Sequence, residues 1–172
     1  NQFVPGESIV LAISGGVDSM VLFDVLRKSK FNLNIILAHV NHKQRSDSEK
    51  EFKEIKKLAH DLQYPFEGYE MIKTENTNFH DSARKQRYDF FQSVAQKYNA
   101  NKIILAHHID DQIETILMRL TRGSSFGGYA GISAMRVEND KQILRPFINI
   151  SKNDILSYAN EHSIVYYEDA SN

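Results

Sequence analysis

Short apolar runs alternate along this chain with longer segments of helical periodicity, and this alternation limits the fold more than any other feature of the sequence. The runs are brief and mostly rich in β-branched residues, which favours buried strands. Strands are predicted over residues 8–13, 34–40, 65–72, 103–106 and 164–167. Helices are predicted over residues 19–28, 81–98, 110–122 and 151–160, and one more follows the capping box of Ser46 and Glu49.

The spacing of the strands favours parallel pairing, because crossovers of about 20 to 40 residues are far longer than hairpin turns. We therefore predict an α/β fold: a doubly wound, mostly parallel sheet with helices on both faces. Polar clusters follow three of the predicted strands, at residues 14–19, 39–45 and 107–114. Because ligands bind at the carboxyl ends of parallel strands, we expect these clusters to meet in one active site.

Composition excludes several classes of protein. The 172 residues suffice for one domain, and 41% of them are apolar, as in soluble globular proteins. Cysteine is absent, which excludes disulfides, thiolate zinc sites and iron–sulfur clusters held by these residues and fits a reducing compartment; we expect the cytoplasm. We expect neither a membrane span nor a signal peptide, because no long apolar run occurs. A net charge of −1 leaves nucleic-acid binding to a local patch or another domain.

The first polar cluster has the properties of a phosphate-binding loop. Ser14-Gly15-Gly16-Val17-Asp18-Ser19 lies between a predicted strand and a predicted helix, where backbone N–H groups and the helix dipole favour an anion. The alternative, a plain strand-to-helix turn with Asp18 as a helix N-terminal charge, is disfavoured for the complete hexapeptide in this context. No lysine follows the glycines, so this is not a Walker A loop. A grip on the whole pyrophosphate favours attack at the α-phosphorus over γ-phosphoryl transfer.

Three acids follow the fourth predicted strand. Asp110, Asp111 and Glu114 have helical spacing, and we expect them to share one side of the helix. They are expected to point away from its apolar residues, which are Ile113, Ile116, Leu117 and Leu120. Such a cluster can hold Mg²⁺ or pair with a cationic group. The alternative is that acids in a first helical turn only complement the helix dipole.

Histidine and arginine pairs add further candidates. His107 and His108 can be metal ligands, which makes a metal phosphohydrolase a rival hypothesis; alternatively, one ring faces a phosphate and the other packs against the strand. Two arginine pairs are three residues apart, and each can meet ATP phosphates or an RNA backbone. Their alternative is a solvated helix face. These pairs are Arg84 with Arg87 and Arg119 with Arg122.

The hexapeptide resembles the pyrophosphate loop of the N-type ATP pyrophosphatases, the PP-loop family. Further strings follow in an order similar to the catalytic domain of tRNA(Ile)-lysidine synthetases, over nearly the whole chain from Val10 to Asn172. These strings are His39-Val40-Asn41-His42, residues 81–91, 106–115 and 119–124, Gly131-Ile132 and Arg145-Pro146. The resemblance implies an adenine nucleotide alpha hydrolase-like fold, a catalytic domain over 1–172, and tRNA-binding domains beyond it.

The resemblance also implies a chemistry. ATP and Mg²⁺ would adenylate the C2 carbonyl oxygen of the wobble cytidine in isoleucine tRNA, and the ε-amine of free L-lysine would then displace AMP. Three alternatives stay open: another adenylating enzyme of this class such as a tRNA thiolase, the metal phosphohydrolase, and a nucleotide-sensing module. The missing cysteines count against the thiolase. The oligomeric state stays open, with a homodimer as one alternative.

Residue roles are carried over from the resemblance position by position. Asp18, Asp110, Asp111 and Glu114 are expected to be catalytic, with Asp18 and Asp111 as Mg²⁺ ligands and the three later acids as the lysine site. The hexapeptide is expected to bind ATP together with Ala12, Ala38, His39, Val40, Arg87 and His107. The residues expected at the tRNA are Lys43, Arg45, Arg84, Arg119, Arg122 and Arg145.

Overall fold

The centre of the protein is a six-stranded sheet in the order β3-β2-β1-β4-β6-β5. The computed structural model describes residues 3–41, 48–71, 79–121 and 131–167. The strands are β1 (Ser8–Ala12), β2 (Asn34–Asn41), β3 (Phe66–Glu70), β4 (Lys102–Ile104), β5 (Met135–Glu138) and β6 (Lys141–Leu144). Every neighbouring pair is parallel except β5 with β6. The predicted doubly wound, mostly parallel sheet is confirmed.

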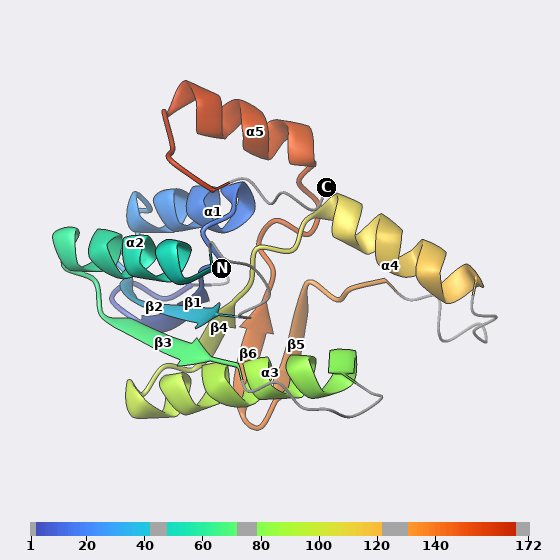
Figure 1. Cartoon of the computed structure of the whole chain (residues 1–172), viewed down its shortest axis with the longest axis horizontal. Helices are drawn as coiled ribbons and strands as arrows, with labels where there is room; N and C mark the ends of the chain where they lie inside the picture. Colours follow the sequence, from blue (N-terminus) through green and yellow to red (C-terminus); the bar gives the residue numbers. More distant parts are fainter. Residues whose placement is uncertain (1–2, 42–47, 72–78, 122–130, 168–172) are drawn as a thin grey trace.

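Helices cover both faces of this sheet. They are α1 (Val17–Arg27), α2 (Ser48–Asp61), α3 (Phe79–Lys97), α4 (Ile109–Thr121) and α5 (Lys152–Glu161). Figure 1 shows α1, α2 and α5 on one face and α3 on the other, while α4 extends away from the edge of the body. No helix among the described segments is long and apolar enough to cross a membrane.

Side chains of the strands alternate between two cores because successive residues point to opposite faces. Ile9 and Leu11 of β1 pack in the cluster that also holds the buried residues of α1, α2 and α5. Val10, between them, packs in a second cluster with Tyr88 and Phe91 of α3. The apolar runs that predicted buried strands therefore serve two cores at once.

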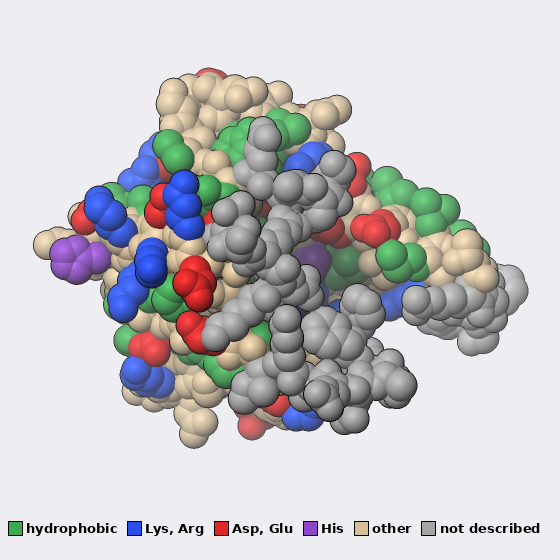
Figure 2. Space-filling view, in the orientation of Figure 1, with side chains coloured by type: hydrophobic (Ala, Val, Ile, Leu, Met, Phe, Trp, Pro, Cys, Tyr) green, Lys and Arg blue, Asp and Glu red, His purple; other side chains and the backbone are tan. Residues whose placement is uncertain are grey.

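The apolar side of α4 is exposed, which differs from the expected packing. No residue of α4 is buried, and Ile113, Leu117 and Leu120 are each about half exposed. Figure 2 shows hydrophobic side chains gathered along this helix. Asp110 and Glu114 line the same hollow of the surface as Ile113 and Leu117. The expectation that the acids point away from the apolar residues is therefore wrong for Asp110 and Glu114, because no residue of α4 is buried and its apolar residues form no core-facing side.

Two other segments differ from the prediction. β5 and β6 form a hairpin that was not predicted; Asn139 and Asp140 turn it, both with positive φ, 47° and 61°. The strand predicted over 164–167 does not form. This segment instead runs past the loop after β1, where the Tyr167 N–H donates a hydrogen bond of 3.0 Å to the Gly15 carbonyl. The capping serine predicted at position 46 lies outside the described residues.

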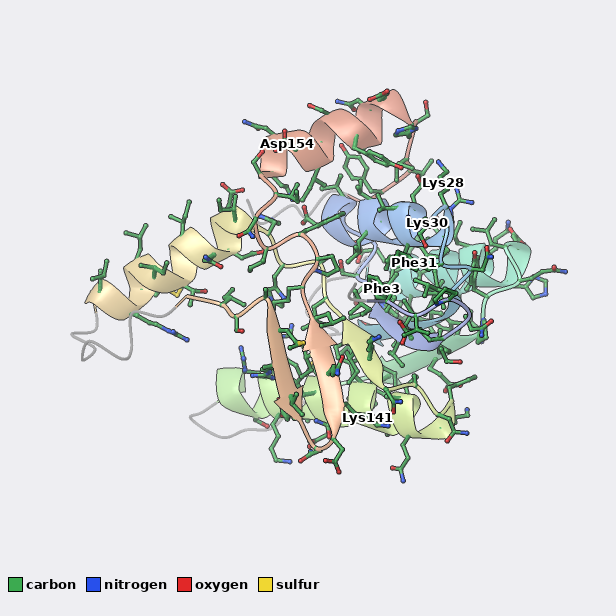
Figure 3. All side chains as sticks on the ribbon, turned by 180° about the vertical axis from the view of Figure 1, so that it is seen from behind. Phe3, Lys28, Lys30, Phe31, Lys141 and Asp154 are labelled. Atoms are coloured by element: carbon green, nitrogen blue, oxygen red, sulfur yellow. The ribbon has the colours of Figure 1, made fainter. Side chains whose placement is uncertain are left out.

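The last helix is fixed to α1 by a buried carboxylate. Asp24 of α1 is 2% exposed and accepts hydrogen bonds from Lys28, Arg27 and the Tyr158 hydroxyl of α5. Burial raises the pKa of Asp24, but the hydrogen bonds from Lys28, Arg27 and Tyr158 outweigh it, so the pKa is lowered from 3.8. Figure 3 shows α5 from behind, with Asp154 in its first turn and Lys28 at the end of α1. The capping box predicted at Ser151 and Asp154 is confirmed.

We expect Asp24→Asn to lower the free energy of unfolding by about 2 kcal/mol, because charge-assisted hydrogen bonds to a buried carboxylate are lost. Asp89→Asn, which breaks an exposed Asp–Lys pair on α3, should cost less than about 0.5 kcal/mol. The measurement is urea unfolding followed by circular dichroism. Because the folded pKa of Asp24 is lowered, its contribution is present above pH 3.8 and lost as the pH falls through that lower pKa. Equal costs for both variants at pH 7 would contradict this role.

Candidate active site

Two loops leave the carboxyl edge of the sheet side by side, because β1 pairs with β4. Leu11 of β1 lies opposite Leu37 of β2 on one side and Ile104 of β4 on the other. The segment 13–16 follows β1, and the segment 105–108 follows β4. The strand order reverses at this point, and such a switch point opens the ligand crevice of a doubly wound sheet. Two of the three predicted polar clusters therefore meet, as expected.

The loop after β1 is held by its own serine hydroxyls. The Ser19 Oγ accepts hydrogen bonds from the N–H groups of Ser14 and Gly15 at 3.1 and 3.2 Å, and the Ser14 Oγ accepts one from the Gly16 N–H at 3.2 Å. Gly16 is the N-cap of α1, and no side chain of the described residues caps this helix. These three N–H groups therefore have serine partners in the free site, and the uncapped N-terminus of α1 beside them is the part of the loop that favours a phosphate. Val17 is buried, so it can meet a ligand only through its backbone.

Gly15 is required by the shape of this loop. Its φ is +93°, and a Cβ there would lie 3.0 Å from both Ile55 and Tyr167. Gly16 differs, because a Cβ would meet only the Ser14 hydroxyl, at 3.5 Å. The first glycine therefore sets the turn, whereas the second leaves room above the loop.

An acidic cluster surrounds His108 next to this loop. Its Nε2 lies 3.7 Å from Asp18 and 3.6 Å from Asp111, and its Nδ1 lies 3.3 Å from Asp110. Asp111 also accepts a hydrogen bond of 2.8 Å from the His108 backbone N–H, which fixes the start of α4. The ammonium group of Lys152 lies 2.7 and 2.8 Å from the two carboxylate oxygens of Asp18. Three predicted catalytic acids, one from α1 and two from α4, are thus brought together.

The neighbouring histidine faces a different environment. Burial and the positive charges of Arg145, Arg87 and Arg84, opposed only by Asp111, lower the pKa of His107 to about 4. Its ring is therefore neutral at pH 7. His108 lies among carboxylates, whereas His107 lies mainly among arginines. Because their surroundings differ in charge, the two rings do not form one metal centre. No group of three or more acidic or histidine side chains in the described segments is arranged to hold a metal ion.

Arginines gather around the buried ring of Tyr88 on this second side. The guanidinium groups of Arg136, Arg84 and Arg87 lie 4.7, 5.3 and 5.7 Å from the ring centroid. Arg145 is 4% exposed and donates to the Ser133 carbonyl at 2.7 Å. Burial, with smaller contributions from neighbouring arginines, lowers the pKa of both Arg87 and Arg145. So much positive charge at one ring makes this side of the crevice attractive to anions.

The end of β2 completes the crevice. The Ile13 N–H donates to the Ala38 carbonyl at 2.9 Å, so the backbone of Ala38 faces β1, and by alternation that of Val40 faces the same way. β1 ends at Ala12, opposite Ala38, so Val40 faces the space beyond the tip of β1. The ring of His39 is buried and bonds the Ile13 carbonyl at 2.7 Å. The side chain of His39 thus supports the loop, which leaves the backbone of this segment to face the crevice.

Other predicted residues lie elsewhere. Glu114 lies one turn further along α4. Unlike the acids of the cluster, its carboxylate forms no ion pair with His108 or Lys152 among the described residues. Arg119 lies in the last turn of α4. Lys43, Arg45 and Arg122 lie outside the described residues.

Sequence reasoning missed Lys152 and Arg136, and of the histidine pair it assigned only His107 to the ATP site. The capping box at Ser151 was a usable signal for Lys152, because it predicts the residue at which α5 begins and hence a side chain at the helix start. No signal in the sequence pointed to Arg136, because the hairpin that carries it was not predicted.

A glycine loop at the switch point of a parallel sheet, flanked by an acidic and a basic wall, defines a Rossmann-like α/β domain that binds a nucleotide. The chain belongs to the PP-loop domain family, whose model matches residues 1–172. It is 38% identical over 172 residues to a tRNA(Ile)-lysidine synthase of Clostridium tetani, covering 95% of this chain and 36% of that protein. It is 40% identical to a bifunctional protein TilS/HprT of Listeria monocytogenes, covering 96% and 27%. The chain thus spans about a third or less of these relatives.

Solved structures share the fold at low identity. A U34-tRNA thiolase, NcsA, from Methanococcus maripaludis with its [4Fe-4S] cluster superposes with a TM-score of 0.79 at 15% identity, covering 99% of this chain and 61% of that one. An NH3-dependent NAD synthetase from Campylobacter jejuni gives 0.59 at 17% identity, covering 92% and 65%. These likenesses confirm the fold class.

The two glycines of the loop should respond differently to alanine. Gly15→Ala should lower the free energy of unfolding by about 2 kcal/mol, because a positive φ is costly for alanine and the Cβ crowds Ile55 and Tyr167. Gly16→Ala should change it by less than about 0.5 kcal/mol in the absence of nucleotide. Thermal and urea unfolding of both variants measure this. Equal stability of the two would contradict the assigned backbone geometry.

Proposed function

We propose that this chain is the ATP-binding catalytic part of an enzyme that joins L-lysine to the wobble cytidine of isoleucine tRNA. The observation that carries the proposal is the meeting of the lysine-free glycine loop with Asp18, Asp110 and Asp111 at one switch point. The names of relatives that match 95% and 96% of the chain support the choice of substrates. We expect the tRNA-binding domains in the remaining length of such proteins. We expect the reaction to take place in the cytoplasm.

The reaction has two displacements. In the first, the C2 carbonyl oxygen of cytidine attacks the α-phosphorus of ATP, and pyrophosphate leaves with the electron pair of the broken bond. In the second, the ε-ammonium group of lysine gives a proton to a carboxylate of α4, and the neutral amine attacks C2. AMP leaves with the oxygen, and the new C–N nitrogen releases a second proton to solvent. We assign the outer phosphates, which become the leaving group, to the α1 N-terminus and to loop N–H groups that would exchange a serine hydroxyl for a phosphate oxygen. This assigns the polyphosphate to Ser14–Ser19 and the adenine to the backbone of Val40.

Mg²⁺ fits the acidic wall by its donor chemistry. Asp18 and Asp111 both approach His108 Nε2, at 3.7 and 3.6 Å, so their carboxylates flank the same space. Mg²⁺ takes one or two protein carboxylates together with phosphate oxygens and water, and it would neutralise phosphate charge there. Asp110, Asp111 and Glu114 then offer carboxylates for the ammonium group of free lysine, on a helix that reaches out from the crevice.

The basic wall is assigned to RNA and to ATP. Arg84 and Arg145 lie at the Tyr88 ring with the predicted ATP ligand Arg87 and the neutral His107, so phosphate groups of both substrates can be held on this side. We keep Lys43, Arg45, Arg119 and Arg122 as proposed tRNA contacts and a homodimer as an open alternative.

A thiolase is disfavoured although the structural likeness to one is high. The thiolase is named with its [4Fe-4S] cluster, and this chain has no cysteine with which to ligate one. A metal phosphohydrolase is disfavoured because His107 and His108 face different surroundings. Among these alternatives, ligation of an amine is the reaction that these residues fit best.

The test is product analysis with the protein at its native length. With ATP, lysine and an isoleucine tRNA transcript we expect AMP and pyrophosphate, each dependent on both lysine and tRNA. Asp18→Ala should reduce AMP formation about 100-fold or more, with an unchanged circular-dichroism spectrum. Asp89→Ala, an exposed acid of α3, is the matched control and should retain activity. Release of ADP, or turnover that needs no tRNA, would overturn the proposal.

A further inference from the structure

We propose that Lys152 supplies the cation that the glycine loop lacks: its ammonium group pairs with Asp18 in the free site and moves to the outer phosphates when ATP binds. This rests on the proposed function, because it assigns the pyrophosphate to the loop. Lys152 lies 134 residues after Asp18 in the sequence, and it is the first residue of α5. The fold therefore brings to the loop a lysine that the loop sequence does not contain.

Two contacts fix the backbone of Lys152 while its side chain stays adjustable. The capping box of Ser151 and Asp154 sets the start of α5, and the Lys152 N–H donates to Asp110 Oδ2 at 2.9 Å. The ammonium group lies 2.7 Å from Asp18 Oδ1, and the side chains of Lys152 and Asp18 are 33% and 26% exposed. A flexible four-carbon stem lets the ammonium shift from one oxygen ligand to another without moving the helix.

Electrostatics give the ammonium a reason to move. Asp18 lies in the first turn of α1, beside the N–H donors that are assigned to phosphate. An unpaired carboxylate there would repel a polyphosphate, and Lys152 cancels that charge in the free site. A triphosphate carries more charge than one carboxylate, so it competes for the ammonium and releases Asp18 for its predicted role as a metal ligand.

The chemical role follows from where charge develops. When the bond from the α-phosphorus breaks, its electron pair stays on the pyrophosphate oxygen. The Lys152 ammonium donates hydrogen bonds to that oxyanion and keeps all its protons, so no further acid or base is needed. The rival explanation is that Lys152 is only a counter-ion for Asp18 and never contacts phosphate.

Pyrophosphate binding separates the two explanations without any turnover. Calorimetric titration with inorganic pyrophosphate compares the unchanged chain with Lys152→Met, Asp18→Asn and the double variant. If Lys152 is a phosphate ligand, Lys152→Met lowers pyrophosphate affinity about tenfold or more, both in the unchanged chain and in Asp18→Asn. The reason is the loss of a charge-assisted hydrogen bond. Lys57→Met, which removes an exposed ion-paired lysine of α2, should leave the affinity unchanged.

If Lys152 is only a counter-ion, Lys152→Met lowers pyrophosphate affinity only where Asp18 is present. Equal pyrophosphate affinity of Asp18→Asn and the double variant would therefore overturn the proposal. These two variants also carry the test if Lys152→Met alone does not fold, because neither contains an unpaired Asp18. The proposed function can fail separately. If products form without free L-lysine while pyrophosphate binding depends on Lys152, the proposed function is overturned and the role of Lys152 is supported. Lysine- and tRNA-dependent AMP release with pyrophosphate affinity unaffected by Lys152→Met would overturn this proposal alone.

Discussion

β1 hydrogen-bonds to β2 on one side and to β4 on the other, and these two pairings bring the loop after β1 between the ends of β2 and β4. The connections that leave this centre use opposite faces: α1 and α2 lie on one, and α3, which leads into β4, lies on the other. Right-handed crossovers require this arrangement when the strand order reverses. The gap between the diverging connections is where the loop after β1 and the segment after β4 emerge. Chemistry-bearing residues far apart in the sequence meet there because of strand order.

Charge is separated across this crevice although the chain is nearly neutral, with a net charge of −1. On one wall, Asp18 is balanced by the ammonium group of Lys152, and the acids lie around the His108 ring. On the other, the arginines gather at Tyr88, where burial and the positive charges of Arg145, Arg87 and Arg84 keep His107 neutral. A polyphosphate placed between the walls meets cations from both, whereas a free amine meets carboxylates. Local placement rather than overall composition therefore gives the site its anion affinity.

The sequence allowed the sheet and much of the site to be predicted, because buried parallel strands leave continuous apolar runs and the glycine loop has a recognisable local pattern. It did not reveal Lys152, since an ion pair across 134 residues depends on how α5 docks on α1. The exposed face of α4 was misjudged because apolar periodicity identifies a stripe without identifying what covers it. Tyr167 was placed in a strand for a similar reason: a β-branched and aromatic run is equally suited to packing against a loop.

The central claim is that the outer phosphates of ATP bind the lysine-free loop at the start of α1. The most direct measurement is a crystal structure with an ATP analogue whose α,β-bridge resists cleavage. We expect the β- and γ-phosphates within hydrogen-bond distance of the Gly15 and Gly16 backbone, the adenine at Val40, and the α-phosphorus open toward Asp111. A nucleotide bound at another edge of the sheet, or one whose γ-phosphate alone points into the crevice, would contradict the claim.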